Sequence, residues 1–367
     1  MGYNPERTEK EMKKQKLAAA AMSLILLMTG CKVVDEKNYT ERTTGQSETT
    51  EATRLTTTEK AEEEPSDGSY RFEYKQFVVS DMFRDTMGED MYVAYRNFIT
   101  AIENGETEFE CADEDTFGWM MGQYAYNCNP CVAEYVKSDY YADGVGHFSY
   151  TIPEDEFRVK LQEWEELVTD IINGCGIQED DSDLEKALLI YLYISDNYVY
   201  DYYAADNAQV DELSAYRLFT GGQGICQEIG IGYAYLLMQV GVDAAGCGGW
   251  SVYSTVPHEW TIVHIGDHYY NIDATFALGQ NTLDLFLMSD EDRYAQGGYT
   301  ADQMTRVNHY PYEMDDNYVS PYVCDDDSVP EFVCTTFEDL DHENNIIYYS
   351  TCEGGCQMHE FDFSDYV

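Results

Sequence analysis

The stretch of sequence that decides the fold is GGQGICQEIGIGYAYLLMQVGV, residues 221–242. It opens with three glycines and a glutamine, a flexible lead that lets the backbone approach another molecule closely. From Cys226 to Val240 the apolar residues follow a helical pattern, and Gly241 is a residue type that commonly ends a helix. The stretch therefore predicts a glycine-rich loop leading into a helix that begins at Cys226.

Three strand-like segments follow this helix, at residues 250–256, 259–265 and 268–273. Gly266-Asp267 has the composition of a tight turn between the last two. A helix followed by antiparallel strands indicates an α+β layout. We therefore predict an α+β fold in which the helix that begins at Cys226 packs on an antiparallel sheet.

Three residues of this region have the chemistry of a thiol enzyme. A nucleophilic cysteine needs a lowered pKa, a base within reach and a group that orients the base. Cys226 lies at the predicted helix N-terminus, where the dipole favours a thiolate. His258 opens one predicted strand and Asp273 closes the next, so antiparallel pairing would bring them side by side. The alternative is that Cys226 is a core residue, since cysteine is often buried.

The order and spacing of these residues resemble the transglutaminase-like superfamily, whose core is related to papain-type cysteine peptidases. The resemblance covers residues 182–290, and several spaced elements in one order are more specific than a single motif. The matching elements are Glu185-Lys186-Ala187, Tyr200-Asp201, Gly224-x-Cys226-Gln227, Leu236-Leu237, Gly241-Val242, His258-x-Trp260, Tyr269-Tyr270-x-x-Asp273-x-Thr275 and residues 286–290.

The resemblance implies a catalytic role for three of these residues. Cys226 would be the nucleophile, His258 the general base and acid, and Asp273 the group that orients the imidazole. His264 and His268 lie close by in the sequence, but neither is followed by a tryptophan at the matching position. The resemblance implies a fold built for acyl transfer, with no metal and no cofactor.

The resemblance is less definite about the residues that contact the substrate. The backbone N–H of Cys226 would supply one oxyanion donor, and Gln223 or Tyr200 the second. Trp260 is expected either to line the substrate site or to lie in the core. Two positions depart from the usual family pattern, where Thr261 replaces an asparagine and Glu228 replaces a small residue; both bear on substrate preference.

The N-terminus has the pattern of a secretory signal peptide. Four lysines precede an apolar run over residues 17–28, which is about 18 Å long as a helix and too short to span a membrane. The run ends in Leu-Met-Thr-Gly before Cys31, which resembles the bacterial lipobox, so we expect lipid attachment at Cys31. Ordinary secretion is the alternative, and Met1 and Met12 are both candidate starts.

The chain divides into five predicted regions. Residues 1–31 form the signal peptide, and residues 32–69 a disordered Thr/Glu-rich tether with too few apolar residues to fold. Residues 70–175 form a mainly helical α+β region, with helices expected around 92–102 and 157–174. Residues 176–320 form the transglutaminase-like domain, whose first helix begins with a Ser182/Glu185 capping box. Residues 321–367 form a C-terminal tail with a β-hairpin.

Composition limits the partners. The chain of 367 residues carries a formal net charge of -49, which argues against binding to nucleic acid because a phosphate backbone would be repelled. Of the 11 cysteines, Cys128 and Cys131 have redox-motif spacing without the expected strand–helix context. We therefore expect the remaining cysteines to be small buried residues or to form disulfides.

Together these features predict a surface-anchored bacterial cysteine enzyme that performs acyl transfer or hydrolysis on peptide or carboxamide bonds. Its substrate would be a peptide or protein, with cell-wall peptides as one class. It would be lipid-anchored to the outer face of the cytoplasmic membrane. The alternative is a catalytically silent binding module or adhesin that keeps the fold.

Overall fold

The computed structural model describes residues 72–208, 212–305, 307, 321–352 and 356–367, which lie in one compact unit. The predicted signal peptide, the lipidation site at Cys31 and the tether lie outside the described residues. Among the residues described, no helix combines the length and the apolar character that a membrane span requires.

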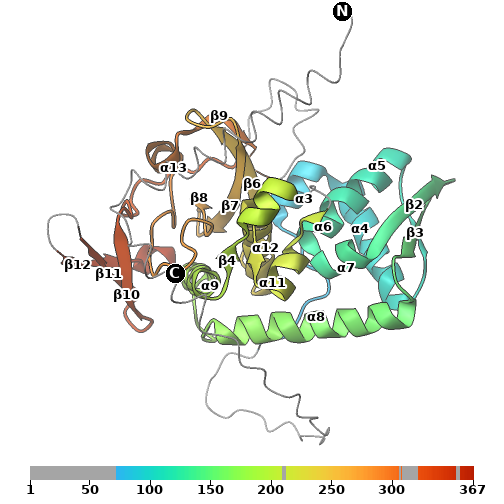
Figure 1. The fold of residues 1–367 in the computed structure, drawn as a ribbon, viewed down its shortest axis with the longest axis horizontal. Coiled ribbons are helices and arrows are strands. Elements are labelled where there is room, and N and C mark those ends of the chain that lie inside the picture. Colours follow the sequence, from blue (N-terminus) through green and yellow to red (C-terminus); the bar gives the residue numbers. More distant parts are fainter. Residues whose placement is uncertain (1–71, 209–211, 306, 308–320, 353–355) are drawn as a thin grey trace, which may run out of the picture. The chain divides into compact units, whose positions relative to one another are not determined.

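A four-stranded antiparallel sheet forms the centre of the C-terminal half, with strand order β8-β7-β6-β9 (Figure 1). Thr261 of β7 pairs with Ile272 of β8, and the predicted turn at Gly266-Asp267 joins the two strands. Asp273 directly follows β8. The strands are β6 (Ala244–Ser251), β7 (Pro257–Ile265), β8 (His268–Ile272) and β9 (Tyr299–Thr305).

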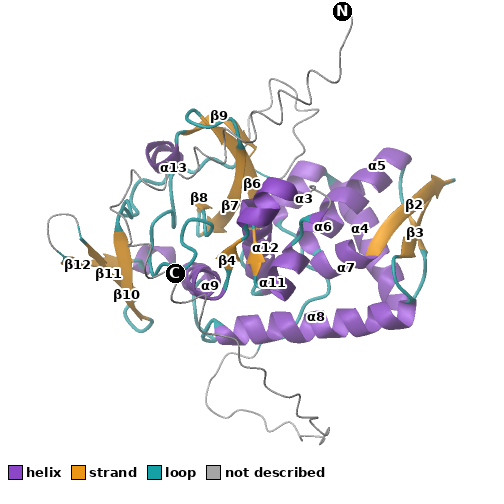
Figure 2. Cartoon of the chain, in the orientation of Figure 1, coloured by secondary structure: helices purple, strands orange, loops and turns teal. Residues whose placement is uncertain are grey.

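Helix α12 (Cys226–Gln239) packs on strands β6 and β7, between the sheet and the N-terminal helices (Figure 2). Every residue from Glu228 to Gln239 is buried, as expected of a helix that is apolar around its circumference. A Cβ atom at Gly230 would lie 2.9 Å from the Trp260 carbonyl oxygen, so helix and strand meet backbone to backbone. Thr261 donates its hydroxyl to the Gly230 carbonyl at 2.7 Å, which fixes this contact.

The first predicted strand of the sheet was misplaced. A strand was expected over residues 250–256, whereas β6 covers 244–251 and ends near the start of that range. The segment Ala-Ala-Gly-Cys-Gly-Gly has little β propensity, so its composition did not indicate a strand. Five of the six residues from 244 to 249 are buried, and small side chains suit a strand covered by a helix on one face.

The N-terminal half is mainly helical, with a small antiparallel sheet of order β1-β3-β2. The helices expected around 92–102 and 157–174 are confirmed as α4 and α8, and Gly105 ends α4 in the left-handed conformation. The elements are α3 (Asp81–Met87), α4 (Glu89–Asn104), β1 (Glu108–Glu110), α5 (Glu114–Trp119), the π-helix η1 (Met120–Tyr124), α6 (Ala125–Cys128), α7 (Pro130–Tyr135), β2 (Val136–Ala142), β3 (Val145–Tyr150) and α8 (Glu154–Gly174).

Helix α9 (Asp183–Asn197) begins with the predicted capping box, in which Ser182 and Glu185 exchange hydrogen bonds. It leads into β4 (Val199–Tyr200), which pairs in parallel with β5 (Gln223–Gly224). The short helices α10 (Tyr202–Asn207) and α11 (Ala215–Gly221) lie between these strands in sequence, and α13 (Asp290–Gly297) precedes β9.

The C-terminal segment forms a three-stranded antiparallel sheet of order β10-β11-β12, followed by the short helix η4 (Ser364–Tyr366). Strands β11 (Ile346–Thr351) and β12 (Gln357–Asp362) pair where a hairpin was expected, and β10 (Thr335–Asp341) adds a strand that the sequence did not suggest. Thr335 donates its backbone N–H to Asp284 at 2.8 Å, which connects this sheet to the loop after β8.

Candidate active site

Cys226 is the first residue of α12 and is half-buried. The residue before it, Ile225, has an extended backbone, so the chain turns sharply from strand β5 into the helix. Pairing of β4 with β5 sets Tyr200 opposite Gly224, two residues before the thiol. The free N–H groups of the first helical turn and the helix dipole favour an anion at this position.

Glu228 holds the start of this helix in place. Its side chain is fully buried and accepts hydrogen bonds from the N–H of Ile225 at 2.9 Å and of Ser214 at 3.0 Å. Arg217 of α11 donates to both of its carboxylate oxygens, in the bidentate arrangement typical of strong ion pairs. The departure noted at this position therefore has a structural role, which the sequence did not reveal because Arg217 lies in a different helix.

The same arginine extends the network to the strand beside the thiol. Arg217 donates to Asp201 at 2.8 Å, directly after β4. The hydrogen bonds that Arg217 donates to Glu228 raise the pKa of Arg217, and the one that it donates to Asp201 lowers the pKa of Asp201. Three charged groups thus connect α11, the end of β4 and the start of α12.

His258 and Asp273 meet through the β7–β8 pair. The Nε2 atom of His258 lies 2.6 Å from Oδ2 of Asp273, and Asp273 is fully buried. Oδ1 of Asp273 accepts the N–H of Thr275 at 3.1 Å, which fixes the carboxylate plane. Because Nε2 bonds to the carboxylate, Nδ1 is the ring nitrogen that remains to exchange a proton with a thiol.

Arg293 is a second cation on Asp273 and was missed by the sequence analysis. Its Nη2 donates to Oδ2 of Asp273 at 2.9 Å, and its side chain is only 1% exposed. The guanidinium stacks over the rings of Trp260 at 4.4 Å and Tyr299 at 4.3 Å. No motif surrounds Arg293, and the only available signal is an arginine within an otherwise acidic helix.

The electrostatics of this pair favour a charged imidazole. Burial, the largest single cause, lowers the pKa of His258, but the negative charges of Asp273, Tyr299 and Cys226 and the hydrogen bond to Asp273 together outweigh it and raise this pKa well above 6.5. Burial alone raises the pKa of Asp273, whereas His258 and Arg293 lower it, with a net shift below the ordinary value. The site is therefore arranged for an imidazolium opposite a carboxylate at neutral pH.

Cys226 interacts electrostatically with His258 and Tyr200. A negative charge on its sulfur raises the pKa of His258, and it adds to burial in raising the pKa of Tyr200. The thiol, the imidazole and the phenol of Tyr200 therefore share one environment. Gln223, the other predicted oxyanion donor, is exposed in β5.

Trp260 lies in the core rather than at a substrate surface. It is fully buried, and its indole N–H donates to Asn271 at 2.9 Å. The expectation that it lines the substrate site is corrected, because one face of its ring is occupied by Arg293 and no part of it reaches solvent. Its position between His258 and the arginine makes it a support for the site.

The two neighbouring histidines lie away from this arrangement. His264 is six residues beyond His258 along β7, which corresponds to about 20 Å in a strand. Its ring stacks on Tyr269, and His268 is exposed at the start of β8.

Exposed aromatic side chains border the site. Phe276 is 39% exposed and its ring lies 5.3 Å from that of His258. At the start of α10, Tyr202 is 55% exposed and its ring lies 4.9 Å from that of Tyr200. Phe276 thus offers an apolar ring to solvent, and Tyr202 an apolar ring that carries a polar hydroxyl.

The Cys128-x-x-Cys131 motif lies elsewhere, in the core of the helical half. Both thiols are essentially inaccessible, at 1% and 0% exposure. Burial raises the pKa of each, which disfavours the thiolate that redox chemistry requires. The structure thus fits the expectation of small buried residues at these two positions.

Comparison with known proteins agrees with this architecture. Residues 172–274 match the family described as the transglutaminase-like superfamily. This segment is therefore similar to that superfamily, and it has the mixed helix-and-sheet architecture described above. No curated protein matches the sequence.

Two solved structures are similar to the chain. One is the crystal structure of a TGase, with 14% identity and a TM-score of 0.28 over 45% of this chain and 48% of the other. The second is a candidate cysteine protease from Cytophaga hutchinsonii, with 14% identity and a TM-score of 0.28 over 50% of this chain and 68% of the other. The chain thus spans about half the length of the first. Both similarities are too weak to support an inference about activity.

Proposed function

We propose that this protein is a cysteine enzyme that cleaves or transfers acyl groups at peptide or carboxamide bonds, with Cys226, His258 and Asp273 as its catalytic residues. The observation that carries the proposal is the 2.6 Å contact between His258 and a fully buried Asp273, in the same electrostatic environment as a thiol at a helix N-terminus.

The reaction starts from the ion pair in which the proton of the Cys226 thiol already resides on Nδ1 of His258, as the raised pKa of that histidine favours. The thiolate attacks the carbonyl carbon, and a C–S bond forms while the oxygen takes the negative charge. The C–N bond then breaks as the imidazolium gives its proton to the departing nitrogen. A thioester and a free amine result, and Asp273 holds the ring in one orientation throughout.

The second half of the reaction regenerates the thiol. His258 takes a proton from water, the hydroxide attacks the thioester, and the C–S bond breaks to release a carboxylic acid. An amine in place of water would give a new amide. The N–H of Cys226 is one donor for the oxyanion, and Tyr200 supplies the second through its hydroxyl. We favour hydrolysis as the main outcome.

The proposed substrate is a peptide or protein outside the cell. The exposed rings of Phe276, beside His258, and Tyr202, beside Tyr200, would contact it. The signal-peptide pattern and Cys31 support a lipid anchor at the outer face of the cytoplasmic membrane, where cell-wall peptides and secreted proteins are accessible.

Alkylation kinetics test the proposal. Iodoacetamide labelling should be followed by mass spectrometry of the Cys226 peptide, because Cys352 and Cys356 are also exposed and would react. We expect Cys226 to react at least ten-fold faster than a free model thiol at pH 7, and His258→Ala to remove this advantage. His264→Ala is the matched control, because it removes a histidine from the same strand away from the site.

Product analysis then separates the two reactions. A peptide mixture incubated with the protein and a fluorescent primary amine would show labelled acyl groups for transfer, and unlabelled new carboxylates at the same carbonyl for hydrolysis. A Cys226 that reacts no faster than a model thiol, with a rate unaffected by His258→Ala, would leave a silent binding module as the correct interpretation.

A further inference from the structure

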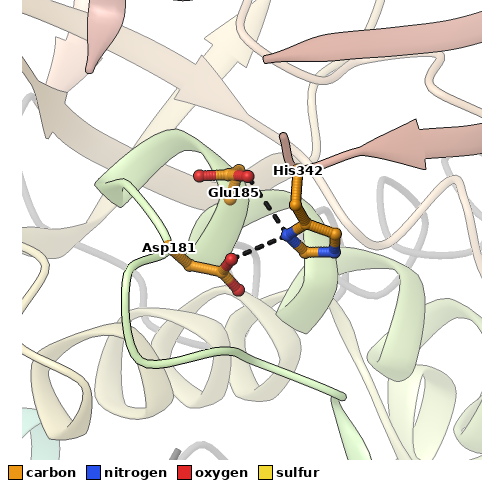
Figure 3. A group of neighbouring side chains, drawn as sticks. All are labelled: Asp181, Glu185 and His342. Atoms are coloured by element: carbon orange, nitrogen blue, oxygen red, sulfur yellow. Dashed lines mark hydrogen bonds and ion pairs between the residues drawn. The ribbon is translucent and has the colours of Figure 1, made fainter. Parts of the chain in front are cut away.

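A second cluster of ionisable side chains lies at the start of α9, the helix that leads into β4. It consists of Asp181, Glu185 and His342 (Figure 3). The two carboxylates are 7% and 3% exposed, whereas the histidine side chain is 27% exposed. His342 lies in the turn between β10 and β11, so segments about 160 residues apart in sequence contribute to one cluster.

The donor atoms converge on one point. Nδ1 of His342 lies 2.7 Å from Oδ1 of Asp181 and 3.2 Å from Oε1 of Glu185, and the three atoms lie within 4.8 Å of one another. The second oxygen of each carboxylate is already used. That of Asp181 accepts the N–H of Gln178 at 2.8 Å, and that of Glu185 accepts the N–H and hydroxyl of Ser182 at 2.7 and 2.8 Å.

These outer hydrogen bonds orient the two free oxygens toward the imidazole. Supporting contacts of this kind hold metal ligands in place in protein sites. The partly exposed histidine also leaves one side of the cluster open to solvent, which provides an entry path for an ion.

The three side chains of the cluster carry a net negative charge. Two carboxylates and a neutral imidazole carry −2 in a largely buried site, and a protonated imidazole leaves −1. Glu185 lies in the first turn of α9, where the free N–H groups and the helix dipole favour negative charge. A divalent cation between the three donor atoms would balance the charge completely.

We propose that Asp181, Glu185 and His342 bind a divalent transition-metal ion, with Zn²⁺ as the representative. The imidazole nitrogen separates this donor set from the all-oxygen sites preferred by Ca²⁺ and Mg²⁺. Three protein ligands leave a coordination position for water. The ion would fasten the C-terminal β-sheet to the first helix of the transglutaminase-like domain, and this role does not depend on the activity proposed for Cys226.

Zinc titration of the full chain, without an affinity tag, tests the proposal. After chelator treatment and dialysis, calorimetry should detect one Zn²⁺ per chain, with at least ten-fold weaker binding in His342→Ala. His268→Ala is the matched control, because this exposed histidine lies at the start of β8 and should leave the affinity unchanged. Asp181→Asn keeps the shape of the side chain and provides a second variant in which affinity should fall.

X-ray absorption at the zinc edge of the loaded wild-type protein identifies the ligands without any variant. We expect nitrogen and oxygen neighbours with one imidazole. A sulfur shell at the longer thiolate distance of about 2.3 Å would overturn the proposal, because it would assign the ion to cysteines. Equal zinc affinity in wild type and His342→Ala, or no stoichiometric binding by the wild type, would also overturn it and leave the cluster as an ion pair.

Discussion

Replacing Arg293 with methionine should weaken the protein because it removes one of the two cations on a buried carboxylate. Arg293 is 1% exposed and Asp273 is fully buried, so no water replaces the lost hydrogen bond. Methionine retains much of the apolar volume against Trp260 and Tyr299, which keeps the packing loss small. The loss of stability should therefore result mainly from the loss of the guanidinium charge.

The magnitude follows from the contacts that are lost. Breaking a buried ion pair by removing one partner typically costs about 3–5 kcal/mol. His258 remains bonded to Asp273, so the carboxylate keeps one cation and the loss should lie near the lower limit, at about 3 kcal/mol. The unpartnered Nε of Arg293 lowers the net value of the arginine and supports the lower figure.

Urea unfolding followed by circular dichroism measures the difference in free energy of unfolding between the variant and wild type. The pH dependence of that difference provides a second test. The pKa of Asp273 is lowered in the folded state, so its contribution is present above the unfolded pKa of about 3.9 and is lost as pH falls through the folded value. Arg293→Met makes that pKa less depressed. The variant should therefore lose most stability at neutral pH, and the gap from wild type should narrow below about pH 4.

Arg84→Met is the control, since the pair Arg84–Glu89 is exposed and its loss should be barely measurable. An Arg293→Met protein as stable as wild type at pH 7, or a stability gap that widens in acid, would refute the reasoning. The first result would mean that Asp273 is solvated, and the second that its carboxyl is protonated in the native state.

Three further predictions concern the same region. Asp273→Asn should lower the pKa of His258 because the largest influence that opposes burial is removed, so the alkylation rate of Cys226 below pH 7 should fall about ten-fold; an unchanged pH–rate profile would contradict this. Glu228→Gln should destabilise the fold by about 2–3 kcal/mol in urea, since it weakens a buried charge-assisted network with Arg217, and an unaltered midpoint would contradict it. Gly230→Ala should lower the free energy of unfolding by about 1–3 kcal/mol, because its Cβ would meet the Trp260 carbonyl. Gly118→Ala is the control, because the space at its Cβ position is open and alanine should not destabilise the helix. Equal effects of the two substitutions would exclude the close helix–strand contact.

Elements with local signals were predictable from the sequence. The capping box at Ser182 and the glycine at 105 mark helix ends through hydrogen bonds within one turn, so α9 and α4 were predicted close to their observed bounds. The turn at Gly266-Asp267 fixed the β7–β8 register and hence the proximity of His258 and Asp273. Each of these features depends on residues that are close together in the chain.

Features that depend on distant partners were not predictable. Strand β6 was not predicted at its observed position because its glycines and alanines have low β propensity. These residues suit a strand only because a helix covers it, and that packing cannot be read from propensity. Arg293 escaped because its partner Asp273 is 20 residues earlier and only the fold brings them together. Glu228 was noted as unusual, but its structural role depends on an ion pair with Arg217, which lies eleven residues earlier in another helix.

The family match ends at residue 274, yet the carboxylate of Asp273 depends on Arg293, which lies 20 residues after it and outside the matched segment. The edge strand β9, which borders β6, also lies beyond that limit. A fragment cut at the boundary of the matched segment would expose one side of the sheet and leave a buried anion half neutralised. The smallest autonomous piece of this protein should therefore extend at least through residue 305, and expression trials of shorter fragments should yield insoluble material.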